Sequence, residues 1–158
     1  MHSVHDMAKG VNMRFEISPA RQAALNELIV YMLRNSISQR LFIGISGIPG
    51  AGKTTLSRQL ERMLIDKGLK VITISQDDFR IDKDQRVDEQ GNFLVDDLPF
   101  INQWHNWRDI YEVLQFIKNT SAKSGRMQVK LYDSNTHKRT KLHEYKIDRY
   151  STYVIFFE

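Results

Sequence analysis

The sequence has no cysteine, no long apolar run and only three prolines. The lack of cysteine and the lack of a long apolar run each exclude a class of protein. Without cysteine the chain has neither disulfides nor thiolate metal sites, which fits a reducing compartment. No segment approaches the ~20 consecutive apolar residues of a membrane helix. Residues 1–10 also lack the apolar middle of a secretory signal. We therefore expect a cytoplasmic protein that does not contact a membrane.

Length and charge narrow the partners further. The 158 residues are enough for one domain with a real core, and 41% hydrophobic with 27% charged residues is an ordinary balance. The net charge of +4 suits a site that handles polyphosphate but is too small to predict nucleic-acid binding. Only the short basic cluster at residues 138–141 keeps an RNA partner open. We expect a small-molecule partner and leave a homo-oligomer open.

The most informative stretch is residues 41–55, LFIGISGIPGAGKTT, which fits G-x-x-x-x-G-K-[ST] at every fixed position. A run of β-formers precedes the motif and a helical pattern over residues 56–67 follows it. This strand–turn–helix context separates a phosphate-binding loop from an ordinary glycine-rich turn. Lys53 should reach the β- and γ-phosphates, and Thr54 should offer its hydroxyl to Mg²⁺. The residues expected to hold ATP are Gly47, Ile48, Pro49, Gly50, Ala51, Gly52, Lys53, Thr54 and Thr55.

The remaining pattern predicts an α/β fold. Residues 1–16 have no period and are expected to form a disordered tail, and Ser18-Pro19 should begin a helix that runs to about residue 37. Strands are predicted at residues 69–75, 127–132, 141–147 and 153–157, with loops at 81–99 and 133–140. We expect residues 17–158 to form one three-layer P-loop domain with a mainly parallel sheet. Residues 41–75 should be one β-α-β unit with a right-handed crossover.

A helix is predicted over residues 104–119, with one face formed by Trp104, Trp107, Tyr111, Leu114 and Ile117. A role in base stacking is open to the two tryptophans, but their helical spacing favours packing in the core. His105, which lies between them, is assigned no role.

Two carboxylates are candidates for chemistry. Asp77 follows the strand at residues 69–75, and ligands of open α/β sheets bind beyond the carboxyl ends of the strands. Its carboxylate could accept the proton of an acceptor hydroxyl, or it could belong to a turn, as Asp78 beside it could. Glu158 ends an apolar strand and could hold Mg²⁺ directly or through water. The alternative for Glu158 is a terminal residue that faces solvent.

Four segments, LFIGISGIPGAGKTT, SQDDF, YDSNTHKR and YVIFFE, resemble in this order the uridine/cytidine kinase and phosphoribulokinase family of P-loop kinases. The resemblance implies ATP- and Mg²⁺-dependent phosphorylation of a small-molecule hydroxyl, with a nucleoside as the expected acceptor. It implies that Asp77 is the base on that hydroxyl and acts with Lys53 in catalysis. Glu158 would be the metal-side carboxylate, together with Thr54.

The resemblance also implies an acceptor pocket. Tyr132 and His137 would contact the nucleobase, and Arg139 would lie nearby. A tyrosine ring offers a stacking face and a histidine offers a hydrogen bond, although a core tyrosine and a surface histidine fit the same pattern. An acid at Asp96 or Asp97 could hold ribose hydroxyls, because the family has an acid in this region.

The sequence departs from the family in two places. Asp78-Phe79-Arg80 replaces a segment that usually carries serine or tyrosine, which leaves pantothenate and glycerate open as acceptors. Family members also continue, after the position of Glu158, through a lid helix with arginines and further strands. We therefore expect a domain that is incomplete at its C-terminus, with weak turnover or none. A nucleotide-binding module without catalysis is the alternative function.

Overall fold

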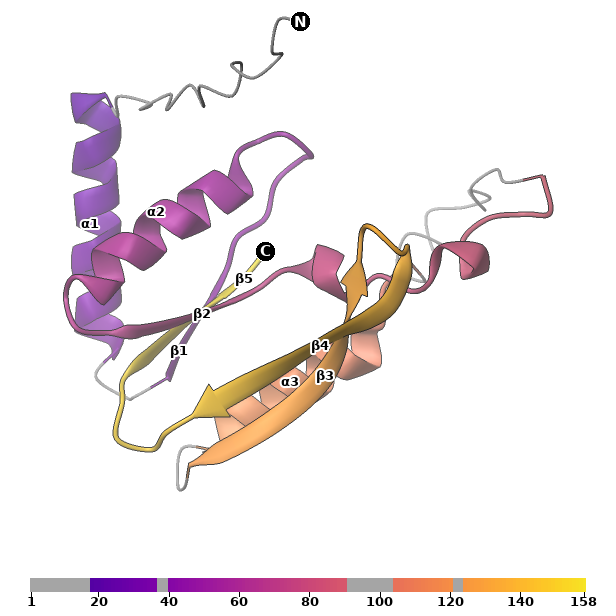
Figure 1. Cartoon of the computed structure of the whole chain (residues 1–158). Coiled ribbons are helices and arrows are strands. Elements are labelled where there is room, and N and C mark those ends of the chain that lie inside the picture. The colour runs from indigo at the N-terminus through magenta and orange to yellow at the C-terminus, as the bar shows by residue number, and fades with distance from the viewer. Residues whose placement is uncertain (1–17, 37–39, 91–103, 121–123) are drawn as a thin grey trace, which may run out of the picture.

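The computed structural model describes residues 18–36, 40–90, 104–120 and 124–158 (Figure 1). The predicted tail at residues 1–16 and the acidic pair Asp96-Asp97 lie outside these ranges. None of the described helices is long and apolar enough to cross a membrane. The elements in chain order are α1 (Pro19–Asn35), β1 (Arg40–Gly44), α2 (Lys53–Ile65), β2 (Lys70–Ile74), η2 (Gln76–Phe79), η3 (Lys83–Gln85), α3 (Trp107–Asn119), β3 (Gly125–Asp133), β4 (Lys138–Ile147) and β5 (Tyr153–Phe157).

The predicted parallel sheet is present, with three strands in the order β1-β5-β2. Val154 of β5 lies in register with Leu41 of β1 on one side and with Val71 of β2 on the other. The β1-α2-β2 unit therefore leaves room for one strand between its own two strands, and the last strand of the chain fills it. This arrangement places the C-terminal end of β5 beside the loop that follows β1 (Figure 1).

Strand β5 is buried on both faces. Val154 and Phe156 pack into a core with α1 and α2, whereas Tyr153 and Ile155 pack into a second core with α3 and the β3-β4 hairpin. Neighbouring residues of a strand point to opposite faces, so a strand covered on both sides needs a continuous apolar run. This explains why YVIFF carries no polar residue.

The first layer consists of α1 and α2. The hydroxyl of Ser18 accepts a hydrogen bond from the Arg21 amide (3.3 Å), and Pro19 occupies the first turn, so the predicted helix start is observed. The side chains that α1 buries against α2 and the sheet are Leu25, Ile29 and Met32.

Helix α3 begins at Trp107 rather than Trp104, because the side chain of Asn106 caps it by accepting a hydrogen bond from the Asp109 amide (3.0 Å). The predicted apolar face was right for Ile117 and Leu114, which lie in or against the core, and wrong for Trp107 and Tyr111. Trp107 is 41% exposed and Tyr111 is 62% exposed. The buried face is formed by Ile110, Val113 and Ile117, which pack on the hairpin. Trp107 and Tyr111 lie at the edge of the same apolar side of the helix, so the predicted face was rotated from the buried one.

The predicted loop at residues 133–140 is shorter than expected. Strand β4 begins at Lys138 and pairs antiparallel with β3, from Asp133↔Lys138 to Gly125↔Ile147. The polar residues 138–140 extend because β3 supplies hydrogen-bonding partners, which their own preferences do not reveal. The predicted loop at residues 81–99 is described only as far as residue 90, and that part contains the short helix η3. Before it, η2 follows β2 directly, and Arg80 forms a bridge with His105.

Candidate functional site

The glycine-rich loop joins β1 to α2 and has the backbone geometry of an anion cradle. Gly50 and Gly52 adopt φ of +79° and +82°, in the left-handed region. A Cβ at either position would meet nothing within 4 Å, so the requirement for glycine comes from the backbone angle and not from crowding. The Ala51 amide donates to the Ile48 carbonyl (3.1 Å) and closes the turn.

Helix α2 starts at Lys53 without a side-chain cap, since its N-cap is Gly52, and its first turn carries no acidic residue. The amides of a helix's first turn have no carbonyl partners, and the helix dipole places partial positive charge there. The amides of Lys53, Thr54 and Thr55 are therefore available to an anion. This is the arrangement that binds phosphate at helix N-termini.

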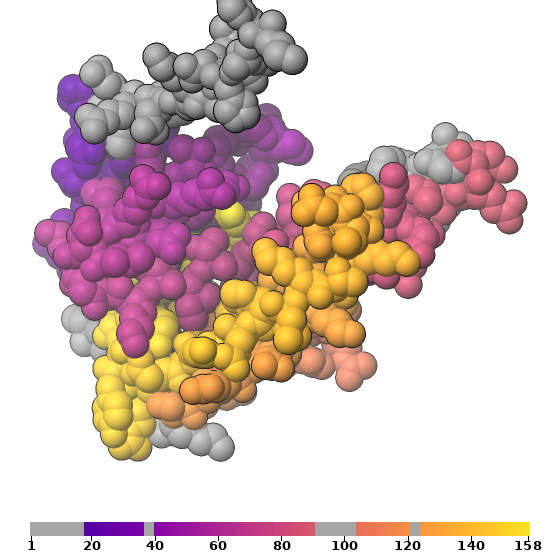
Figure 2. Space-filling view, viewed as in Figure 1, coloured from indigo at the N-terminus to yellow at the C-terminus, as the bar shows by residue number. Residues whose placement is uncertain are grey.

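A cavity of about 860 Å³ lies over this loop, at the carboxyl ends of the three parallel strands. We call it the phosphate cavity. In Figure 2 the yellow end of β5 is visible between the magenta loop-and-α2 segment and the orange hairpin. The phosphate cavity is lined by four of the predicted site residues: Lys53, Thr54, Asp77 and Glu158.

The Lys53 ammonium group bridges the loop. Its Nζ donates to the carbonyl oxygens of Gly47 (2.9 Å) and Ile48 (3.3 Å). An ammonium has three donors, so one remains for a phosphate oxygen in this position. The lysine thus places a positive charge at the floor of the loop.

Glu158 is fixed by its neighbours. Its amide donates to the Ile74 carbonyl (3.0 Å), and its carbonyl accepts from the Gln76 amide (2.7 Å). Its carboxylate Oε2 accepts a hydrogen bond from the Ser57 hydroxyl (2.8 Å), and Ser57 is only 1% exposed. Ser57 was missed by the sequence analysis. Its signal was its position four residues after Lys53, on the same face of α2.

The oxygen donors of the cavity fit Mg²⁺. The Thr54 hydroxyl and the Glu158 carboxylate line the same cavity, and Mg²⁺ is typically held by one or two protein oxygens together with substrate phosphates. Among the described residues there is no group of three or more His, Cys, Asp or Glu side chains that could hold a metal without such help. A metal here would depend on the phosphates of a nucleotide.

Asp77 faces the phosphate cavity from η2 and forms an ion pair with Arg80. The Arg80 Nη2 donates to Asp77 Oδ1 at 2.6 Å, and the two side chains are 40% and 67% exposed. Phe79, the last residue of η2 and the neighbour of Arg80 in the sequence, is fully buried and anchors η2 in the core. The sequence analysis noted Arg80 only as a departure from the family, whereas in the structure it is the second cation of this cavity.

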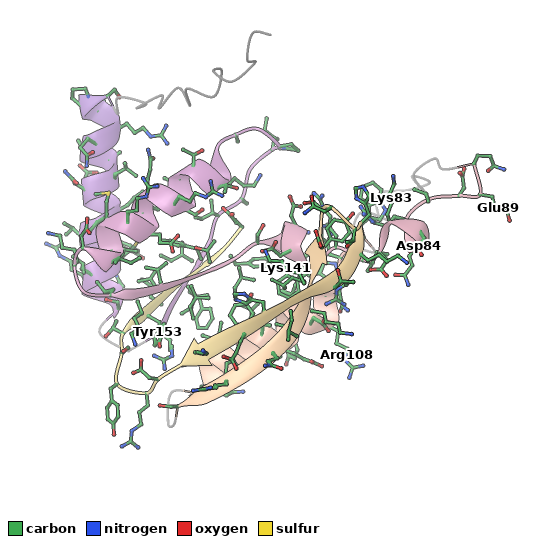
Figure 3. The ribbon with its side chains drawn as sticks, viewed as in Figure 1. Lys83, Asp84, Glu89, Arg108, Lys141 and Tyr153 are labelled. Carbon is green, nitrogen blue, oxygen red and sulfur yellow. The ribbon has the colours of Figure 1, made fainter. Side chains whose placement is uncertain are left out.

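Asp78 does not line the phosphate cavity. Burial raises the pKa of its carboxyl group, while the positive charge of Lys141 and the ring of His143, both on β4, act in the opposite direction. Figure 3 shows Lys141 beside η2. The two adjacent aspartates therefore have different environments, with Asp77 at the cavity and Asp78 toward the hairpin.

Tyr132 and His137 meet at the tip of the hairpin. The Tyr132 hydroxyl lies 3.1 Å from His137 Nδ1 and accepts a hydrogen bond from Arg86 Nη2 (2.8 Å). The Arg86 guanidinium also lies over the Tyr132 ring, 5.1 Å from its centroid. His137 adopts a φ of +56°, which is uncommon for a residue other than glycine. Arg86 is 6% exposed and was not predicted.

Arg139 belongs to a different network. Its guanidinium forms an ion pair with Asp109 of α3 and donates to the Lys130 carbonyl (2.6 Å). Its amide donates to Asp82 Oδ1 (2.7 Å). These bonds tie the hairpin to α3 and to the segment before η3. Tyr132, His137 and Arg139 are not among the residues that line the phosphate cavity.

Comparisons with known proteins show which fold carries this site. A family model described as Novel STAND NTPase 3 matches residues 32–154. Among solved structures, the chain is similar to one titled "Structure of a Possible Uridine Kinase from Bacillus stearothermophilus", with 19% identity and a TM-score of 0.65 over 87% of this chain and 70% of that chain. A search of curated proteins found no match. At this identity the structural likeness shows the fold alone, which is a nucleotide-binding P-loop NTPase fold.

Proposed function

We propose that this chain, which belongs to the Novel STAND NTPase 3 family, binds ATP with Mg²⁺ and transfers the γ-phosphoryl group to a hydroxyl of a small, nucleoside-like molecule. One observation carries the proposal. A single cavity brings together the phosphate-binding loop, the oxygen donors Thr54 and Glu158, and the exposed carboxylate of Asp77. The likeness to a structure described as a possible uridine kinase supports the same class of reaction.

The loop and Lys53 would hold the triphosphate. The helix-start amides and one remaining Lys53 donor point the positive charge at the β- and γ-phosphates, where negative charge gathers during transfer. Mg²⁺, held by Thr54 and Glu158 with the phosphates, would neutralise part of that charge. Ser57 would orient the carboxylate by its hydrogen bond, as outer-shell partners of metal ligands do.

Asp77 would act on the acceptor. Its carboxylate takes the hydroxyl proton while the acceptor oxygen bonds to the γ-phosphorus, and the bond from that phosphorus to the bridging oxygen of ADP breaks. The ion pair with Arg80 must open or share its oxygens for this step. An exposed ion pair contributes only about 0–1 kcal/mol, so the phosphates of bound ATP can compete for Arg80. Nucleotide binding would thereby free the base.

The hairpin tip is the proposed acceptor pocket. The ring of Tyr132 offers a face for an aromatic base and the exposed His137 offers a hydrogen bond beside it, while the buried Arg86 holds the tyrosine in place. A nucleoside would use both the ring face and the hydrogen bond, which is why we favour it over pantothenate or glycerate. Arg139, which is engaged with α3, would support the pocket from outside.

A second candidate is a nucleotide-binding protein that hydrolyses ATP slowly or only binds it. Three observations favour it. The family description names an NTPase, and Asp77 is occupied by Arg80 while the hairpin-tip residues lie outside the phosphate cavity. In that case water, or nothing, would take the place of the acceptor hydroxyl.

The test incubates the chain with ATP, Mg²⁺ and each of uridine, cytidine, pantothenate and glycerate, and follows ADP and phosphorylated acceptor by chromatography. We expect one acceptor to be phosphorylated. Asp77→Asn should lower kcat about 10²- to 10⁴-fold, the usual contribution of a general base. Asp84→Asn, on exposed η3, is the matched control and should keep full activity.

Two results would decide against the kinase. Free phosphate without any phosphorylated acceptor would establish the hydrolase instead. Binding of ATP in calorimetry, lost in Lys53→Ala, without any product would establish the binding module.

A further inference from the structure

A second cavity, of about 330 Å³, lies between α1 and the glycine-rich loop. It shares Ile45, Ser46, Gly52 and Lys53 with the phosphate cavity, so the two cavities adjoin along the loop. Asp77 and Arg80 line only the phosphate cavity. We call the second cavity the α1 groove. It has no role in the phosphate-transfer chemistry described above.

The walls of the α1 groove are mainly apolar. Helix α1 buries one stripe, Leu25, Ile29 and Met32, in the core. It carries a second pair, Ala24 and Leu28, which are one helical turn apart and line the groove. Leu28 is 41% exposed although it is a leucine. The apolar surface of α1 therefore extends beyond what its own core uses.

Two cationic side chains line this groove: Lys53, which it shares with the phosphate cavity, and Arg21, which lines the groove alone. Arg21 lines it, and its Nη2 donates to Gln59 Oε1 of α2 (2.9 Å), which holds the guanidinium between the two helices. A guanidinium is planar, stacks on aromatic rings and donates hydrogen bonds but accepts none. It suits the face or the acceptor atoms of an aromatic heterocycle.

We infer that the α1 groove binds the base of the nucleotide whose phosphates lie in the phosphate cavity, and that it prefers a purine; the inference rests on the proposed function. A nucleoside triphosphate has an anionic tail and a flat, largely apolar ring. Lys53 lines both cavities where they adjoin. Beyond it, the phosphate cavity has Thr54 and Thr55 at the start of α2, whereas the α1 groove has the apolar Ala24 and Leu28. The larger ring of a purine covers more of this apolar wall than a pyrimidine does.

This assignment places the base of the bound nucleotide and the acceptor molecule on different sides of the glycine-rich loop. The base would lie on the α1 side of the loop, while the acceptor would approach from η2 and the hairpin, where Asp77 and Tyr132 lie. Neither ligand would obstruct the other. Helix α1 would then set the nucleotide preference, although it is outside the sheet and the glycine-rich loop.

The test compares two triphosphates, of which one carries a nucleoside and the other does not. ATP and inorganic tripolyphosphate, each with Mg²⁺, are titrated calorimetrically into the wild-type chain and into two variants. Leu28→Gln keeps the helix and the volume but makes the groove wall polar. Val30→Gln is the matched control, since Val30 is 44% exposed on the same helix and does not line the groove.

We expect Leu28→Gln to weaken the binding of ATP about fivefold to tenfold, as removal of one partly buried apolar contact does. The binding of tripolyphosphate should not change. Val30→Gln should change neither ligand, and GTP should behave as ATP does while CTP binds more weakly. An equal loss for both ligands, or no loss for ATP, overturns the base groove while the phosphate cavity stands. If neither ligand binds the wild-type chain, the proposed function fails and the inference with it.

Discussion

The buried hydrogen bond between Ser57 and Glu158 gives the sharpest prediction. Ser57→Ala removes a single oxygen atom from a side chain that is 1% exposed, so it leaves neither a large cavity nor a new polar group. The change leaves Glu158 Oε2 without its 2.8 Å donor. The carboxylate keeps its charge and its backbone anchors to β2 and η2, but it loses the group that fixes its rotamer.

The size of the effect follows from the kind of bond. A hydrogen bond to a charged group contributes about 1.5–3 kcal/mol, and part of that is recovered when the freed carboxylate turns toward water in the cavity. Outer-shell partners of metal ligands typically change metal affinity or activity by about 10- to 100-fold when they are removed. We therefore expect the Mg²⁺ concentration for half-maximal ATP turnover to rise about tenfold. Binding of ATP without metal should not change.

The assay measures ATP turnover against Mg²⁺, and the melting temperature reports on folding. Ser36→Ala is the matched control: its hydroxyl is also buried and donates to a carbonyl three residues earlier (3.0 Å), but it lies at the end of α1. Both variants should lose similar stability, and only Ser57→Ala should shift the Mg²⁺ dependence. An unchanged Mg²⁺ dependence would show that Glu158 does not serve the metal.

Two further predictions concern pH. The hydrogen bond from Lys70, followed by those from the Ser151 hydroxyl and others, lowers the pKa of Asp148 well below its unfolded value of 3.8; the ionised group therefore stabilises the fold above that pH and loses this effect as pH falls. Asp148→Asn should lower the urea midpoint at pH 7, less so at high salt, and the loss should shrink progressively as the pH falls below 3.8. Burial raises the pKa of Asp78, so stability that is present below its unfolded pKa of 3.8 is lost as pH rises through the folded value. Asp78→Asn should therefore raise the melting temperature at pH 7 but not at pH 3, and a lower melting temperature at pH 7 would contradict this.

The parts of the fold that were predictable are those with local causes. The glycine-rich loop follows from a motif whose glycines are needed for positive φ at Gly50 and Gly52. The start of α1 follows from the cap at Ser18. Strand β5 follows from a run that is apolar at every position. In each case the residues that decide the structure lie within a few positions of one another.

The parts that were wrong depend on how separate elements pack and pair with one another. The face that α3 buries is decided by the hairpin, which packs on Ile110 and Val113 and leaves Trp107 exposed. The early start of β4 at Lys138 is decided by its pairing with Asp133 of β3. The sequence could place Asp77 at a strand end, but it did not show that Arg80, only three residues later, pairs with it.

Because β5 lies between β1 and β2, the site is complete only when the last strand of the chain has joined the sheet. The loop, Lys53 and Thr54 lie on one local segment, but Glu158 reaches them only when β5 enters between β1 and β2. The bonds that seat it, from the Ile45 amide to Phe157 and from the Gln76 amide to Glu158, join residues far apart in the chain. Contacts of this kind form only after the loop-closure entropy has been overcome. Val154→Ala, which weakens β5, should therefore lower Mg²⁺-dependent turnover more than it lowers phosphate binding. Turnover needs the carboxylate of Glu158, whereas phosphate binding needs only the loop.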